Sequence, residues 1–115
     1  MTRIVAWAWG GWALALLLTG AAAAQDDPQF VAVRYHEAAR AAELCAKKKF
    51  TSAEQDKLAV LVGQQTRHSL PVGEELTAIR AARHNMEERI TAGGCTDPIV
   101  ADALRFYDTF RDRLR

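Results

Sequence analysis

Apolar and small residues recur with helical spacing in four segments of this chain after residue 27. The first segment shows the pattern clearly, because intervals of four and three residues separate Val31, Tyr35, Ala38, Ala42 and Cys45. Such intervals place side chains on one face of an α-helix, and the many alanines of this segment favour that conformation. The alternation typical of strands is almost absent. The pattern therefore predicts an all-α protein.

Helix-capping residues mark where three of these helices begin. Asp27-Pro28 and Asp97-Pro98 each combine a preferred N-cap residue with a proline at the first helical position. Thr51 and Glu54 have the spacing of a capping box, in which two side chains satisfy backbone N–H groups reciprocally. The sequence thus predicts helices that start at Asp27, at Thr51 and at Asp97.

Stop signals and apolar stripes complete the helix prediction. The lysine run 47–49 is assigned to the last turn of the first helix, where cations suit the helix dipole, with an anion-binding patch as the alternative. The third helix is predicted over Glu74–Ala92, with Gly93-Gly94 as its stop. In the second helix, Val60 broadens the apolar stripe, which indicates cover on more than one side. The expected stripe is Leu58, Leu61, Val62 and Gln65 in the second helix, and Leu76, Ile79, Ala82 or Arg83, Met86 and Ile90 in the third. In the fourth helix it is Ile99, Ala103, Phe106 and Phe110, flanked by Val100, Leu104, Tyr107 and Leu114.

Short connections between these segments favour antiparallel neighbours and predict a small four-helix up-down bundle. Tyr35, Phe106, Tyr107 and Phe110 account for most of the aromatic residues after residue 24. We therefore expect the best-filled part of the core where the first and fourth helices meet.

The two cysteines, Cys45 and Cys95, are expected to form one disulfide. Such a bond would pin the end of the first helix to the start of the fourth. It would close a loop of about 50 residues, which is worth roughly 4 kcal/mol in the chain-entropy model. Free thiols or an intermolecular bridge are the alternatives. Neither cysteine has the spacing to other ligands that a zinc site requires.

Residues 1–24 have the pattern of a secretory signal peptide. Arg3 supplies a basic start, Ile4–Leu18 is an uncharged apolar run, and Ala22–Ala24 offers small residues before a cut after Ala24. An uncleaved membrane anchor is the alternative, because Ile4–Ala24 is long enough to span a bilayer. The expected organisation is a signal peptide at 1–24 and a single helical domain at 25–115 in the periplasm.

Charge and composition exclude several classes of protein. The chain has 15 basic and 14 acidic residues, and Arg3 is the only charged residue before residue 26, so the acidic and basic residues that follow are equal in number. A balanced chain lacks the excess of cations that holds nucleic acid. Its composition also differs from that of disordered proteins, which combine low hydrophobicity with high net charge.

Motifs that carry catalysis or hold a cofactor are absent from the sequence. Ser52 and Ser69 lie outside any nucleophile-elbow motif, and the Cys-x-x-Cys-His haem motif is missing. His84 and Glu88 are four residues apart on a helix, but the two-histidine zinc motif is absent, so a surface pair is favoured. We therefore predict no enzymatic activity, no catalytic residues, no metal site and no cofactor. The charged residues Arg80, Arg83, His84 and Glu87 are the candidate interaction face.

In length after residue 24, cysteine count and cysteine separation, and in Cys45 with Phe50 nearby, the chain resembles the periplasmic acid-stress chaperones. That resemblance implies a helical fold with one disulfide and a chaperone function. Immunity proteins that block toxins in the periplasm are also small and helical.

The function expected from the sequence is a protein-binding or accessory module for another periplasmic protein, with no membrane contact after cleavage. The alternatives are an acid-stress chaperone and a carrier of a metal or haem.

Overall fold

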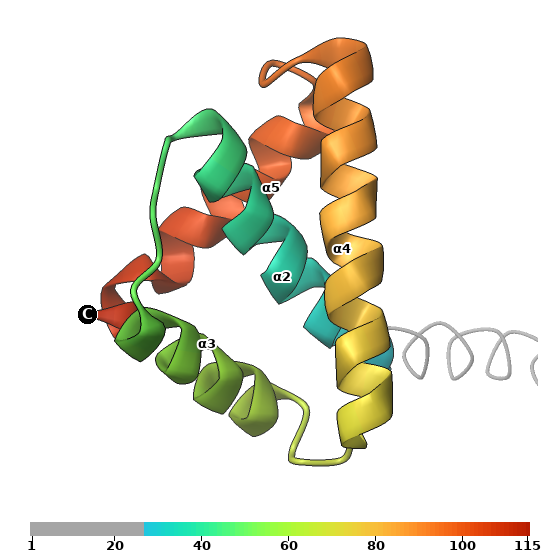
Figure 1. The fold of residues 1–115 in the computed structure, drawn as a ribbon, viewed down its shortest axis with the longest axis vertical. Coiled ribbons are helices and arrows are strands. Elements are labelled where there is room, and N and C mark those ends of the chain that lie inside the picture. Colours follow the sequence, from blue (N-terminus) through green and yellow to red (C-terminus); the bar gives the residue numbers. More distant parts are fainter. Residues whose placement is uncertain (1–26) are drawn as a thin grey trace, which may run out of the picture.

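The computed structural model describes residues 27–115, and over this range the chain is helical, without strands (Figure 1). The predicted signal peptide lies outside the described residues. No helix in residues 27–115 is both long and apolar enough to cross a membrane. The elements are α2 (Pro28–Cys45), α3 (Ser52–Gln65), α4 (Val72–Gly93), α5 (Pro98–Phe110) and the 3-10 helix η2 (Arg111–Leu114).

The predicted helix starts are confirmed by hydrogen bonds at the caps. The Asp27 carboxylate accepts the N–H of Gln29, and the Asp97 carboxylate accepts the N–H of Ile99 at 2.9 Å. At the start of α3, the Thr51 hydroxyl accepts the N–H of Glu54 at 3.1 Å, and the Glu54 carboxylate accepts the N–H of Thr51 at 3.2 Å. These bonds satisfy N–H groups that have no partner inside their own helix. α4 differs, since it begins at Val72, two residues earlier than predicted, without a side-chain cap.

Placing the lysine run in the last turn of the first helix was wrong. α2 ends at Cys45, and Lys47 has a φ of 57°, a left-handed conformation that cannot continue an α-helix. The N–H of Lys48 instead donates to the Ala42 carbonyl at 3.2 Å. The run therefore belongs to the connection between α2 and α3, where the Lys48 ammonium lies 2.9 Å from the Glu54 carboxylate.

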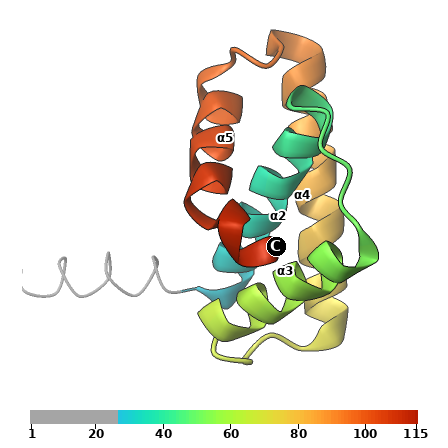
Figure 2. The same cartoon turned by 90° about the vertical axis from the view of Figure 1, so that its left-hand side faces the viewer.

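α2 is the central helix and packs mainly against α4 and α5 (Figures 1 and 2). Its buried residues are all alanines, namely Ala32, Ala38, Ala39, Ala41 and Ala42. A face of small side chains lets neighbouring helix axes approach closely, at the lower end of the usual 8–10 Å. α3 packs on α2 and η2, whereas its contacts with α4 are sparse. The predicted up-down order, in which α3 would pack along α4, is therefore not confirmed.

Aromatic rings fill the junction of α2 and α5, as predicted. The centroid of the Tyr35 ring lies 4.9 Å from the centroid of the Phe106 ring and 5.0 Å from that of the Phe110 ring. The Tyr107 ring packs against the Phe110 ring and also against the Phe50 ring, with 6.0 Å between the centroids of Tyr107 and Phe50. Edge-to-face rings at these separations add about 1 kcal/mol per pair to the free energy of burial. Large side chains from α5 thus compensate for the thin alanine layer of α2.

The disulfide between Cys45 and Cys95 is confirmed, with 5.8 Å between the Cα atoms. Cys45 is the last residue of α2, and Cys95 lies in the connection between α4 and α5. The bond therefore joins the end of the central helix to the start of α5. Both cysteines of the chain are used in it.

The predicted core faces of α4 and α5 need two corrections. The buried residues of α4 are Ala78, Ala82 and Met86, whereas Leu76 is 49% exposed. In α5, Val100 is fully buried and Ile99 is 45% exposed. The buried faces overlap the expected stripes only in part: Ala82, Met86 and Phe110 are buried as expected, whereas Ala78 and Val100 take the places expected of Leu76 and Ile99. Leu76 stays uncovered because α3 does not pack along α4.

Replacing the cap of α5, Asp97→Ala, is expected to lower the free energy of unfolding by about 1 kcal/mol, because two backbone N–H groups lose their acceptor. Urea unfolding followed by circular dichroism measures this loss. The matched control is Asp102→Ala, which removes an exposed carboxylate from the same helix and is expected to change stability by less than about 0.5 kcal/mol. Equal losses in the two variants would contradict the capping role.

Candidate binding groove between α3 and α4

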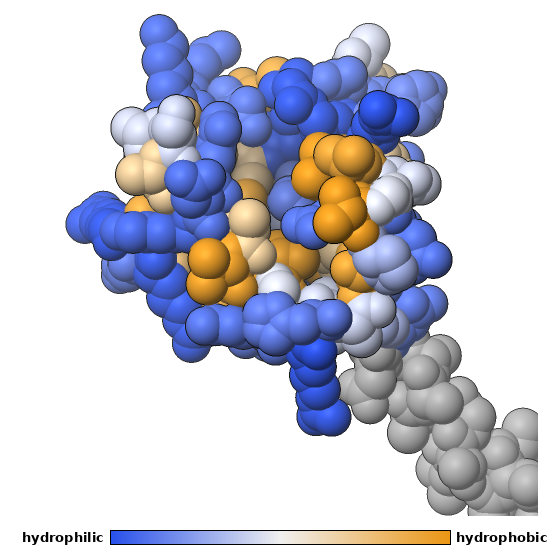
Figure 3. All heavy atoms as spheres, turned by 60° about the horizontal axis from the view of Figure 1, so that its bottom comes forward, coloured by the Kyte–Doolittle hydropathy of each residue, from blue (hydrophilic) through white to orange (hydrophobic). Residues whose placement is uncertain are grey.

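A groove runs between α3 and α4, with α2 as its floor. Its deeper part has a volume of about 250 Å³ and receives side chains from all three helices, among them Ala39, Leu58 and Ile79. A second hollow of about 380 Å³ adjoins it, and Ala59 and Glu75 line both. Figure 3 shows apolar side chains on both sides of a hollow that hydrophilic side chains surround. The groove exists because α3 and α4 diverge while both remain attached to α2.

Exposed apolar side chains lie on both helices of the groove: Val60 lines its second hollow, and Val72 and Leu76 lie on the same side of α4 as the groove residue Ile79. Val60 on α3 is 58% exposed, and Val72 and Leu76 on α4 are 75% and 49% exposed. Such side chains are ordinary when single, but a contiguous group around a concavity is typical of an interaction site. The expectation that Val60 marks cover on more than one side of this helix was wrong within residues 27–115, because its side chain is 58% exposed.

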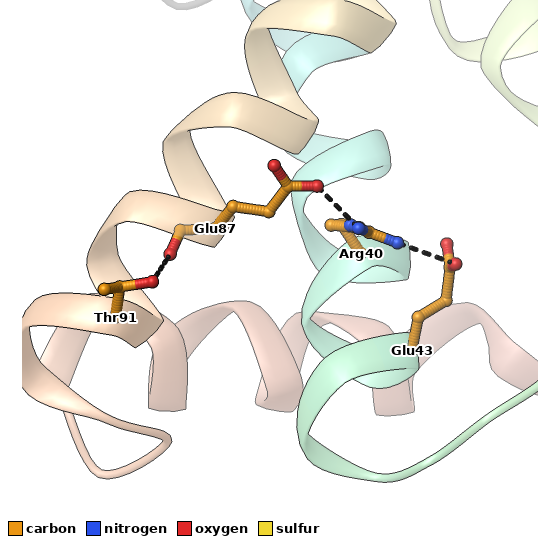
Figure 4. Close-up of polar contacts among 4 residues, drawn as sticks. All are labelled: Arg40, Glu43, Glu87 and Thr91. Carbon is orange, nitrogen blue, oxygen red and sulfur yellow. Dashed lines mark hydrogen bonds and ion pairs between the residues drawn. The ribbon is translucent and has the colours of Figure 1, made fainter.

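Arg40 on α2 connects the floor of the groove to α4. One guanidinium nitrogen lies 3.1 Å from the Glu43 carboxylate, and another lies 2.5 Å from the Glu87 carboxylate (Figure 4). The Glu87 carbonyl also accepts a hydrogen bond from the Thr91 hydroxyl at 2.8 Å. The Arg40 side chain is largely buried, so this bridge is better shielded from solvent than the ion pairs in which both side chains are mostly exposed, such as His84–Glu88. It fixes α4 against α2 along the groove.

His36 lies one helical turn before Arg40 and also lines the groove. Its side chain is largely buried, and within residues 27–115 its Nε2 atom finds no hydrogen-bond partner. Burial disfavours the charged imidazolium and lowers the pKa of His36 to about 4. The imidazole is therefore neutral at pH 7. His36 and Arg40 are four residues apart and share a helix face, but this spacing gives no sign that the histidine is buried.

The four residues predicted as an interaction face do not gather at one site. Arg80, Arg83, His84 and Glu87 all lie on α4 with exposed side chains. Arg83 lines the groove, whereas Glu87 is held by Arg40 and the His84 imidazole lies 3.1 Å from the Glu88 carboxylate. Sequence reasoning missed the other groove residues, above all His36 and Glu75, because their roles depend on where α3 lies.

No cluster of three or more histidine, cysteine, aspartate or glutamate side chains converges within residues 27–115. Comparison of the chain with models of protein families, with curated proteins and with solved structures finds no match.

Proposed function

We propose that this protein is an exported protein-binding module, and that it receives a helical segment of a partner protein in the groove between α3 and α4. The observation that carries the proposal is the exposed apolar side chain of Val60, which lines the groove, together with exposed Val72 and Leu76 on the same side of α4 as the groove residue Ile79. An amphipathic helix can lay its apolar face into such a groove. Burial of each exposed aliphatic side chain would then contribute about 1 kcal/mol or more to binding.

Export rests on the sequence of residues 1–24 and is supported by the disulfide. A bond between Cys45 and Cys95 is compatible with an oxidising compartment such as the periplasm. We propose that residues 1–24 are removed after Ala24 and that residues 25–115 act without catalysis. The proposed partner is another protein of the same compartment.

One observation favours the acid-stress chaperone as a second candidate. A neutral, largely buried His36 becomes charged when the pH falls below its lowered pKa of about 4, and its charge would then lie beside the Arg40 guanidinium. Repulsion between these two cations would loosen the floor of the groove in acid. Suppression of the aggregation of a denatured client protein at pH 3, absent at pH 7, is the result expected for a chaperone.

Photo-crosslinking in the native cell envelope tests the protein-binding proposal. A photoreactive residue at position 60 is expected to yield one discrete crosslinked partner, and Leu76→Glu is expected to reduce this product about tenfold, because a carboxylate would be buried at the contact. Ile99→Glu is the matched control, since Ile99 has a similar exposed fraction but lies outside the groove. Equal losses in both variants, or no product from position 60, would contradict the proposal.

A further inference from the structure

One stripe of α4 contains two residues that line the groove and two exposed apolar residues. Intervals of four, three and four residues separate Val72, Leu76, Ile79 and Arg83, which places all four side chains on one side of the helix. Ile79 and Arg83 line the deeper part of the groove. Val72 and Leu76 continue the stripe as exposed apolar residues. This stripe lies beside the face that α4 buries against α2.

Two opposite charges flank the centre of this stripe. Glu75 lies four residues before Ile79 and Arg83 lies four residues after it, so that about 12 Å of helix axis separates them. Both side chains line the groove. Among residues 27–115, neither takes part in an ion pair within 4.0 Å. Each charge is therefore available to a charge of opposite sign on another molecule.

We propose that the occupant of the groove is α4 of a second copy of this chain, antiparallel to the first and crossing it at Ile79. A two-fold axis at this crossing brings Arg83 of each copy to the level of the partner's Glu75. Two ion pairs of equal geometry then flank an apolar centre. The proposal rests on the proposed function, because it uses the same groove as a protein-docking site and names the occupant.

The charge pattern selects the antiparallel arrangement. If the two α4 helices were parallel and in register, Arg83 would meet the partner's Arg83 and Glu75 would meet the partner's Glu75, and both contacts would be repulsive. The antiparallel arrangement turns each of these contacts into an attractive one. It also gives an interface in which both copies use the same patch, as in most two-fold homodimers. Val60 on α3 covers the inserted helix from the side.

Sedimentation velocity of the exported, oxidised protein tests this pairing. The wild-type protein is expected to dimerise, with an affinity that falls as salt is added because the ion pairs are screened. Arg83→Glu and Glu75→Arg are each expected to raise the dissociation constant about tenfold, because each change places two like-charged pairs in the dimer. The double variant Arg83→Glu/Glu75→Arg restores both attractive pairs and is expected to return within about threefold of wild type.

Arg80→Glu is the matched control, since it makes the same charge change on the same helix outside the residues that line the groove. It is expected to leave the dissociation constant within about twofold of wild type. A wild-type protein that stays monomeric up to about 1 mM, or a double variant as weak as the single ones, overturns the pairing. If the pairing holds, the crosslink from position 60 joins two copies of this chain. A monomeric wild-type protein that crosslinks from position 60 to a different protein overturns the pairing and keeps the proposed function, so the two fail separately.

Discussion

Removing the disulfide with Cys45→Ala and Cys95→Ala together is expected to lower the free energy of unfolding by about 4 kcal/mol. The bond closes a loop with a sequence separation of 50 residues, and release of that loop increases the conformational entropy of the unfolded chain. A loss of this size is comparable to the whole stability of a small domain. Urea unfolding of the wild-type and double-variant proteins, followed by circular dichroism, measures the difference.

Reductant provides the control for this experiment. The wild-type protein should lose stability when a reductant is added, whereas the double variant should not change. The two reduced forms should then agree within about 1 kcal/mol, because Cys95 is exposed and Cys45 only partly buried. A double variant nearly as stable as the oxidised protein would show that the packing of α2 against α5 suffices without the bond.

Lowering the pH from about 6.5 to about 4 is expected to remove about 3 kcal/mol of stability through His36 alone. Burial depresses the pKa of His36 from 6.5 to about 4, so the unfolded chain binds a proton in this range while the folded chain does not. Stability therefore rises with pH between the two values, is fully present above 6.5, and loses nothing further from this group below 4. Unfolding in urea at several pH values measures the slope.

His36→Leu isolates this contribution from that of the carboxylates. The variant should lose the part of the slope that lies between pH 4 and 6.5, because it carries no group that titrates at this position. His84→Gln is the matched control, since it removes an exposed imidazole from α4 in place of a buried one. A His36→Leu profile parallel to that of the wild-type protein would mean that the buried imidazole does not control stability in acid.

Local features of the fold could be predicted from the sequence because their physics is local. The caps at Asp27, Thr51 and Asp97 depend on hydrogen bonds that span two or three residues, and each is confirmed. The disulfide followed from the cysteine count, since two cysteines allow only one intramolecular pair. The aromatic junction of α2 and α5 followed from the uneven distribution of aromatic residues along the chain.

Features of the groove could not be predicted, because they depend on how the helices pack. Leu76 and Ile99 have the periodicity of core residues but are about half exposed, since periodicity identifies an apolar face without showing whether another element covers it. Glu75 and Arg83 have ordinary helix spacing, and their place in the groove depends on α3 diverging from α4. His36 lines the same groove, and its burial follows from the packing of the helices and not from its position in the sequence.

The sequence by itself determined four helices, the starts of the three that carry a side-chain cap and the disulfide, because each of these depends on residues close in sequence or on the two cysteines alone. Only the tertiary structure decided which helix is central. The alanine face of α2 lets α4 and α5 pack closely on either side of it, and α3 is left attached mainly to α2 and η2. The groove results from this arrangement, because no helix packs between α3 and α4 to cover their apolar side chains.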